Sequence, residues 1–164
     1  MKQFPISKQF RACLLEHNDF SLFRELFSRY EIMQYISAPY SSDQIEFLFK
    51  QALSLNEAIG FRQKIWTICN HDKTVAAGIA MLKIRNNVGE VGVMLKPDFW
   101  NMHIGRYAFI ALVNLAEKRE LATSMIAFCH SQNYRSLKTL REIGFAFDSK
   151  MAEEENTFLK GIRK

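Results

Sequence analysis

The chain is 164 residues long, about one domain, and its 48% hydrophobic, 13% aromatic and 24% charged residues exclude a disordered tail or linker. No apolar run approaches the ~20 residues that span a bilayer, and residues 1–5 lack the apolar region of a signal peptide, so we expect one cytoplasmic domain over residues 1–164. The net charge of +5, without a long basic run, favours a phosphorylated cofactor, and we expect neither a nucleic acid nor a membrane as partner.

The first third of the chain predicts one strand and two helices. Residues 11–16 form a short, mostly apolar strand segment. Residues 18–19 can cap a helix whose Phe and Leu side chains follow at helical spacing. Further on, Ser41 and Gln44 have the spacing of a capping box, which predicts a second helix.

Three strands in a meander are predicted for the middle of the chain. Residues 64–70 are β-branched and aromatic, and residues 74–85 form a long run of small and aliphatic side chains. The two asparagines at 86–87 tolerate a positive φ and suit a hairpin turn. Residues 88–95 then form the return strand.

Helices and strands alternate in the last part of the chain. The apolar face that starts at Ile104 predicts a helix, and residues 124–129 predict a buried strand. Asn133 can cap the next helix, and Gly144 suits the position after its end. Two closing strands flank an acidic turn at residues 153–155.

The predicted element order is therefore β-α-α-β-β-β-α-β-α-β-β. This order indicates a mixed α/β fold with one central sheet and helices on both faces. Cysteine and histidine are too scattered for a disulfide framework or a metal site, so we expect buried thiols, ordinary histidines and no metal. These residues are Cys13, Cys69, Cys129, His17, His71, His103 and His130.

The segment from residue 90 to residue 107 carries the strongest chemical signal. A strand ends near Leu95, a short loop follows, and a helix begins near Ile104. Unpaired backbone N–H groups and the positive end of a helix dipole meet at such a helix start, where they can bind a phosphate. Many α/β loops share this arrangement, so by itself it does not identify the ligand.

Two motifs carry a resemblance to a known family. Residues 95–105, with Pro97 and Gly105, are similar to a strand end x-V-x-P followed by R/Q-x-x-G-x-G/A, and Phe99 and Trp100 match a Y-W pair. The block N-x-x-S/A-x-x-x-x-x-x-x-G-F is complete over residues 133–145. The sequence thus resembles the GNAT superfamily of N-acetyltransferases, most closely its RimJ/RimL-like branch, over roughly residues 10–147.

The resemblance implies a fold and an activity. The fold would be a GNAT-like mixed sheet of about six to seven strands. The activity would be transfer of an acetyl group from acetyl-CoA, as co-substrate, to a primary amine of a small molecule or a protein N-terminus by direct attack. The resemblance implies no metal cofactor, and it leaves open whether the protein forms a homodimer.

The resemblance also implies a coenzyme site. The pantetheine arm would pair with one strand end, the diphosphate would bind amides at the helix start, and an asparagine would contact the arm from the other side. Gly105 could instead be only a helix-start glycine, and Asn133 only a helix cap. The implied residues are Val93, Met94, Leu95, Asn101, Met102, His103, Ile104, Gly105, Arg106 and Asn133.

Two residues are candidates for catalysis. The family's acidic Tyr, seven residues after the asparagine, is Leu140 here, so Ser136 is our candidate for a hydrogen bond to the leaving thiolate. Glu90 could act as a base through water, since it shares a strand face with Met94. An ordinary first-turn serine and an exposed strand-end glutamate are the competing interpretations, and the amine could instead lose its proton to water.

His103 occupies the first glycine position of the family's phosphate loop. We expect it to keep a right-handed backbone, because a left-handed histidine is strained. Its imidazole would lie either beside the phosphates or in solvent. The His103 substitution and the absent Tyr leave open a GNAT-like acyl-CoA-binding or regulatory module without turnover.

Overall fold

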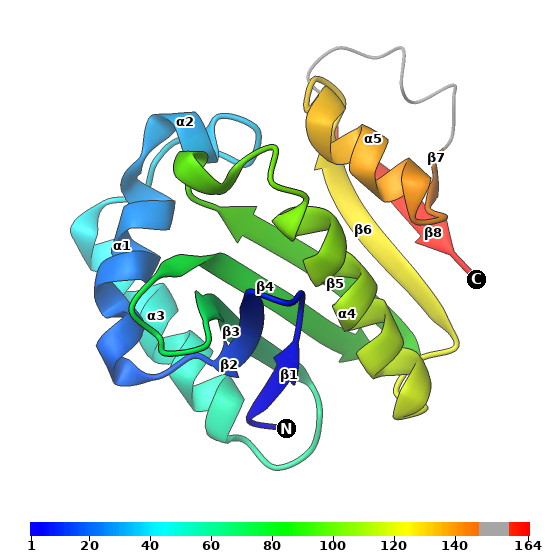
Figure 1. Cartoon of the computed structure of the whole chain (residues 1–164), viewed down its shortest axis with the longest axis horizontal. Coiled ribbons are helices and arrows are strands. Elements are labelled where there is room, and N and C mark those ends of the chain that lie inside the picture. The colour runs from blue at the N-terminus through cyan, green and yellow to red at the C-terminus, as the bar shows by residue number, and fades with distance from the viewer. Residues whose placement is uncertain (148–157) are drawn as a thin grey trace.

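The structure of the chain is a computed structural model that describes residues 1–147 and 158–164 (Figure 1). The helices are α1 Phe20–Ser28, α2 Tyr30–Met33, α3 Ser42–Glu57, α4 Ile104–Lys118 and α5 Tyr134–Glu142. The strands are β1 Gln3–Pro5, β2 Phe10–Leu14, β3 Gln63–Asn70, β4 Ala76–Arg85, β5 Val88–Leu95, β6 Ser124–His130, β7 Ala146–Phe147 and β8 Phe158–Arg163. Two 3-10 turns are at His17–Asp19 and Pro97–Phe99.

The eight described strands form one sheet in the order β1-β2-β3-β4-β5-β6-β8-β7. All neighbours pair antiparallel except β5 and β6, which are parallel. The connection through α4 makes this possible, because a parallel return needs a crossover of a dozen or more residues. The predicted mixed α/β sheet is confirmed, although it has more strands than the expected six to seven.

Helices cover both faces of the sheet, as the sequence predicts. On one face, Leu112 of α4 and Leu140 of α5 belong to a buried cluster that includes Trp66. On the other face, Phe23 of α1 and Phe49 of α3 pack with ring centroids 5.2 Å apart. Figure 1 shows α4 crossing one face of β4 and β5. No helix in the described part of the chain is long and apolar enough to cross a membrane.

Short-range sequence signals form the predicted local structures. The hydroxyl oxygen of Ser41 accepts the backbone N–H of Gln44 at 3.3 Å, and the Gln44 side chain accepts the Ser41 N–H at 2.9 Å. This reciprocal pair satisfies two of the free donors at the start of α3. Asn86 and Asn87 both have positive φ, 50° and 60°, and turn β4 into β5.

Three features differ from the sequence prediction or lie beyond it. β1 and α2 were not predicted, because they are three and four residues long and show no periodicity. The closing strand predicted around residues 157–159 is β8, which continues to Arg163. The predicted acidic turn at residues 153–155 lies outside the described residues.

The three cysteines are free and buried, as predicted. Cys13 and Cys69 lie on neighbouring strands with their Sγ atoms 3.5 Å apart. Burial, followed by the hydrogen bond to Cys13, raises the pKa of the Cys69 thiol to about 11. This thiol therefore stays protonated at neutral pH.

Candidate active site

The site begins where β5 and β6 part. Their parallel pairing covers only Val88–Glu90 of β5 against Ser124–Ile126 of β6. Beyond Glu90, β5 stays paired with β4 as far as Leu95, and β6 stays paired with β8. In Figure 1, β6 diverges from β5 toward α5. Residues 91–95 therefore have one strand edge without a partner strand among the described residues.

A groove of about 420 Å³ opens beside this unpaired edge. Three segments line it: α2 with the turn after it, the end of β5 with the start of α4, and the start of α5. Its only charged lining residues in the described chain are Glu31 and Arg135. The lining residues are Glu31, Ile32, Gln34, Tyr35, Ile36, Val93, Met94, Leu95, Trp100, Gly105, Phe109, Gln132, Asn133, Tyr134, Arg135, Ser136 and Thr139.

Gly78 sets the position of the β5 end. A Cβ on Gly78 would lie 2.0 Å from the Met94 carbonyl oxygen and 2.8 Å from the Leu95 Cα. The Met94 carbonyl therefore points toward β4, while the Leu95 carbonyl accepts the Trp100 indole N–H at 3.0 Å from the other side. Because backbone groups alternate along a strand, Val93 presents its N–H and C=O to the same side as Leu95.

The loop between β5 and α4 contains two left-handed residues, Asn101 at φ 62° and His103 at φ 58°. The expectation of a right-handed His103 is wrong. His103 is the N-cap of α4, and its left-handed backbone turns the chain into the helix without a side-chain cap bond. The histidine thus adopts a conformation that a glycine would take without strain.

The first turn of α4 presents free donors to the groove side. The first helical hydrogen bond of α4 runs from the Tyr107 N–H to the His103 carbonyl at 3.0 Å, so the N–H groups of residues 104–106 have no acceptor within the helix. A Cβ on Gly105 would meet only the Leu95 Cδ1 at 3.6 Å, an ordinary contact. Packing therefore does not require this glycine, whereas a close ligand would.

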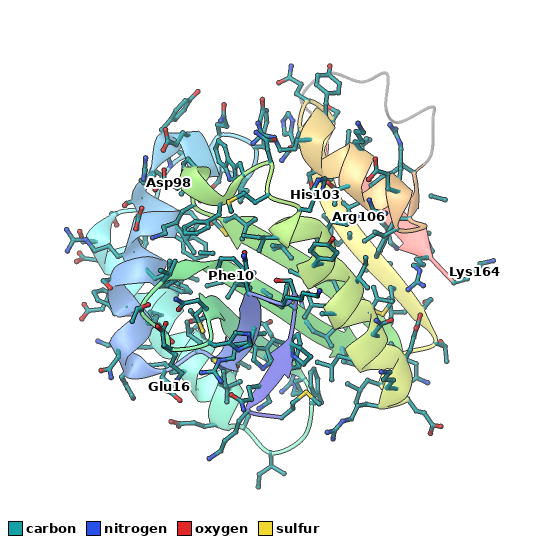
Figure 2. All side chains as sticks on the ribbon, in the orientation of Figure 1. Phe10, Glu16, Asp98, His103, Arg106 and Lys164 are labelled. Atoms are coloured by element: carbon teal, nitrogen blue, oxygen red, sulfur yellow. The ribbon has the colours of Figure 1, made fainter. Side chains whose placement is uncertain are left out.

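The Arg106 side chain is directed at α5. Its Nη1 lies 3.4 Å from Glu142 Oε2, with both side chains about two-fifths exposed. Figure 2 labels His103 and Arg106 at this end of α4. Of the predicted loop residues, Gly105 lines the groove, whereas Asn101, Met102 and His103 are exposed beside it.

The start of α5 forms the opposite wall. The Asn133 side-chain oxygen accepts the Ser136 backbone N–H at 3.1 Å, so the predicted cap is confirmed. The cap uses only the oxygen, which leaves the two amide N–H donors of Asn133 for other partners. Burial raises the pKa of the Cys129 thiol, and a hydrogen bond with the Ser136 side chain and the charge of Arg141 oppose that rise.

Of the two predicted catalytic residues, Ser136 lines the groove and Glu90 does not. Glu90 lies where β5 and β6 are still paired, and its Oε2 is 3.4 Å from Lys83 Nζ. No group of three or more His, Cys, Asp or Glu side chains in the described residues is arranged to hold a metal ion.

Three residues that line the groove had no predicted site role: Trp100, Arg135 and Glu31. Trp100 was quoted only as a family match, and Arg135 only as part of the second motif. Tyr35 lies after α2 and its ring is 5.7 Å from that of His130, so it connects α2 to the end of β6. Glu31 of α2 is exposed and forms an ion pair with Arg29. A four-residue helix gives no periodic signal, so no sequence pattern places Glu31 in the groove.

Comparisons with known proteins agree with this geometry. The family model of the acetyltransferase (GNAT) domain matches residues 11–146. No curated protein matches the chain in sequence.

Several solved structures share the fold at low sequence identity. The acetyltransferase from Salmonella typhimurium that modifies the N-terminal serine of ribosomal protein L7/L12 is 17% identical, with 98% of each chain covered and a TM-score of 0.79. The RimL ribosomal L7/L12 α-N-protein acetyltransferase in complex with coenzyme A is 17% identical, with 98% of this chain and 97% of that chain covered and a TM-score of 0.81. The Vibrio cholerae spermidine N-acetyltransferase with CoA and spermine is 17% identical, with 95% of each chain covered and a TM-score of 0.79.

Proposed function

The chain belongs to the acetyltransferase (GNAT) domain family, and on that premise we propose where its acetyl-CoA and its amine acceptor bind. As a member of this family it is an acetyl-CoA-dependent N-acetyltransferase that acetylates an amine. The observation that carries the proposal is the parting of β5 and β6 beside a groove of about 420 Å³. The predicted coenzyme residues that line this groove lie on both of its walls: Val93, Met94, Leu95 and Gly105 on one, and Asn133 on the other.

The residues present fit the coenzyme. The free edge of β5 offers the C=O of Val93 to an N–H of an amide-containing arm, in the manner of strand addition. Opposite, the Asn133 side chain keeps two N–H donors. The amides of residues 101–106 and the positive end of α4 lie at the far end of the same strand, where they suit a diphosphate. The space above Gly105 leaves room for that approach.

When bound, acetyl-CoA supplies the thioester whose carbonyl carbon the amine attacks. We propose that the backbone N–H of Val93, which faces the groove, donates to the carbonyl oxygen as negative charge develops there. The Ser136 hydroxyl, at the start of α5, donates a hydrogen bond to the departing sulfur and keeps its proton. Glu90 stays our prediction for the base. Since it does not line the groove, it would have to take up the amine proton through water.

We propose that the acceptor is a singly charged amine, such as a peptide N-terminus, which enters beside α2. A polyamine would need several carboxylates, yet Glu31 is the only acidic lining residue in the described chain and is paired with Arg29. The net charge of +5 also disfavours a polycation. Of the two acceptor types that the similar structures name, a protein N-terminus therefore fits better than spermidine.

Two measurements test the proposed function. Calorimetry should show acetyl-CoA binding in the micromolar range, with competition by CoA, on the order of −8 kcal/mol. A thiol-release assay over a panel of amines should then show turnover with peptides that carry a free N-terminus and little with spermidine. No heat at millimolar acetyl-CoA would exclude the coenzyme site, and faster turnover with spermidine would exclude the acceptor class.

A further inference from the structure

A stacked pair of side chains connects the two walls of the groove. The Arg135 guanidinium of α5 lies over the Trp100 ring, 4.9 Å from its centroid. Trp100 belongs to the loop after β5, and its indole N–H is bound to the Leu95 carbonyl at 3.0 Å. The ring is therefore fixed to the strand that forms the floor of the groove, and it supports the guanidinium from below.

The charge of Arg135 is available to a ligand. It is the only cation among the lining residues, and it takes part in none of the ion pairs found in residues 1–147 and 158–164. The nearby Arg106 differs, because its guanidinium is paired with Glu142. A guanidinium held over an aromatic ring still has N–H donors for planar, two-pronged binding of an anion.

The position of Arg135 indicates which anion it binds. Trp100 directly precedes residues 101–106, whose amides form the predicted diphosphate site, so the guanidinium lies over the ring that begins this loop. Arg135 is also in the first turn of α5, where the helix dipole adds positive potential. No described acidic side chain other than Glu31 lines the groove to compete for it.

We propose that Arg135, held in place by Trp100, binds a phosphate of the coenzyme from the α5 side of the groove. This inference rests on the proposed function, since it needs CoA in the groove. It adds a cationic side chain to a phosphate site that the sequence motifs build from backbone amides alone. Trp100 acts as a positioning residue, because it orders the guanidinium without touching the phosphate.

Binding of CoA and of pantetheine, which lacks the phosphates, tests the assignment by titration calorimetry. Arg135→Gln should weaken CoA binding about tenfold or more, because a charge-assisted pair is lost, and should leave pantetheine binding unchanged. Lys138→Gln removes the same charge from an exposed position on α5 and should change neither. Arg135→Lys should restore only part of the affinity, since Lys cannot stack or bind in two prongs.

The ring has a test of its own. Trp100→Leu removes the support but keeps the charge, so it should resemble Arg135→Lys in CoA affinity and keep more of the salt dependence of binding than Arg135→Gln does. The proposal is overturned if Arg135→Gln weakens the binding of CoA and of pantetheine equally. It is also overturned if Arg135→Gln and Lys138→Gln have the same CoA affinity. If wild-type protein binds neither ligand, the proposed function itself fails, which is a different result from a variant-specific loss.

Discussion

Gly78 gives the sharpest test of how the fold builds the groove. In Gly78→Ala the new Cβ would start 2.0 Å from the Met94 carbonyl oxygen, whereas real Cβ atoms do not approach closer than 3.0 Å. The obstacle is backbone on both sides, so β4 and β5 must separate by roughly 1 Å at this point. The hydrogen bond from the Lys96 N–H to the Ala77 carbonyl, now 2.9 Å, lies beside the clash and would lengthen.

We expect Gly78→Ala to lower the free energy of unfolding by about 3 kcal/mol, the upper end of ordinary overpacking. For a domain of this size that corresponds to a fall in Tm of roughly 6–12 °C. The protein should still fold, because domains have about 5–15 kcal/mol of stability. Acetyl-CoA affinity should fall at least tenfold in the folded variant, since Val93 and Leu95 move with the strand.

Gly92→Ala is the matched control, because it makes the same change in the same strand pair. There the new Cβ would meet only the Met81 Cε at 3.3 Å, the end of a flexible side chain. We expect a change in unfolding free energy of less than about 1 kcal/mol and unchanged coenzyme affinity. Denaturant titration and calorimetry on both variants give the comparison. Equal stability and equal affinity of the two variants would refute the reasoning about the β5 end.

Three further predictions concern single side chains. Ser136→Ala should lower kcat on the order of 10²-fold with little change in acetyl-CoA affinity; weaker binding at unchanged kcat would make Ser136 a coenzyme anchor instead. His103→Gly should raise the free energy of unfolding by up to ~1 kcal/mol relative to His103→Ala, because only glycine avoids the left-handed penalty; equal midpoints of the two variants in urea would contradict this. The raised pKa of Cys69 stabilises the folded protein below about pH 9 and that contribution is lost as pH rises toward about 11. Cys69→Ala should therefore flatten the fall in stability over this range in thermal melts, and parallel profiles would show that the thiol does not titrate differently in the two states.

The features that the sequence predicted well depend on neighbouring residues. Ser41 and Gln44 are three residues apart and form their capping box within one turn. Asn133 reaches Ser136 over the same separation. Such contacts form within one turn and do not depend on the rest of the chain. The starts of these two helices were therefore predicted to within a residue.

The features that the sequence did not predict depend on distant segments. β6 keeps its pairing with β8 on one edge while its other edge parts from β5 after Ile126, and no local pattern at residue 90 records this. Glu90 was predicted as a base because it shares a strand face with Met94, and along β5 this is correct. At Glu90, however, β5 is still paired with β6, so the groove begins only beyond this residue. Arg135 and Trp100 are 35 positions apart, so only the fold shows that they meet.

The surroundings of Ser136 define how the leaving sulfur can be stabilised. The Cys129 thiol lies behind it, and its S–H donates to the backbone carbonyls of His130 and Asn133 at 3.7 and 3.8 Å. Burial raises the pKa of that thiol, which therefore keeps its proton at neutral pH, and its S–H is directed at these two carbonyls. A serine hydroxyl is itself too weak an acid to give up its proton, and Leu140 lacks one. In the proposed role, Ser136 would therefore offer a hydrogen bond and not a proton. The sulfur would leave as a hydrogen-bonded thiolate that water protonates later, and replacing Ser136 should affect the rate without creating a pH dependence of its own.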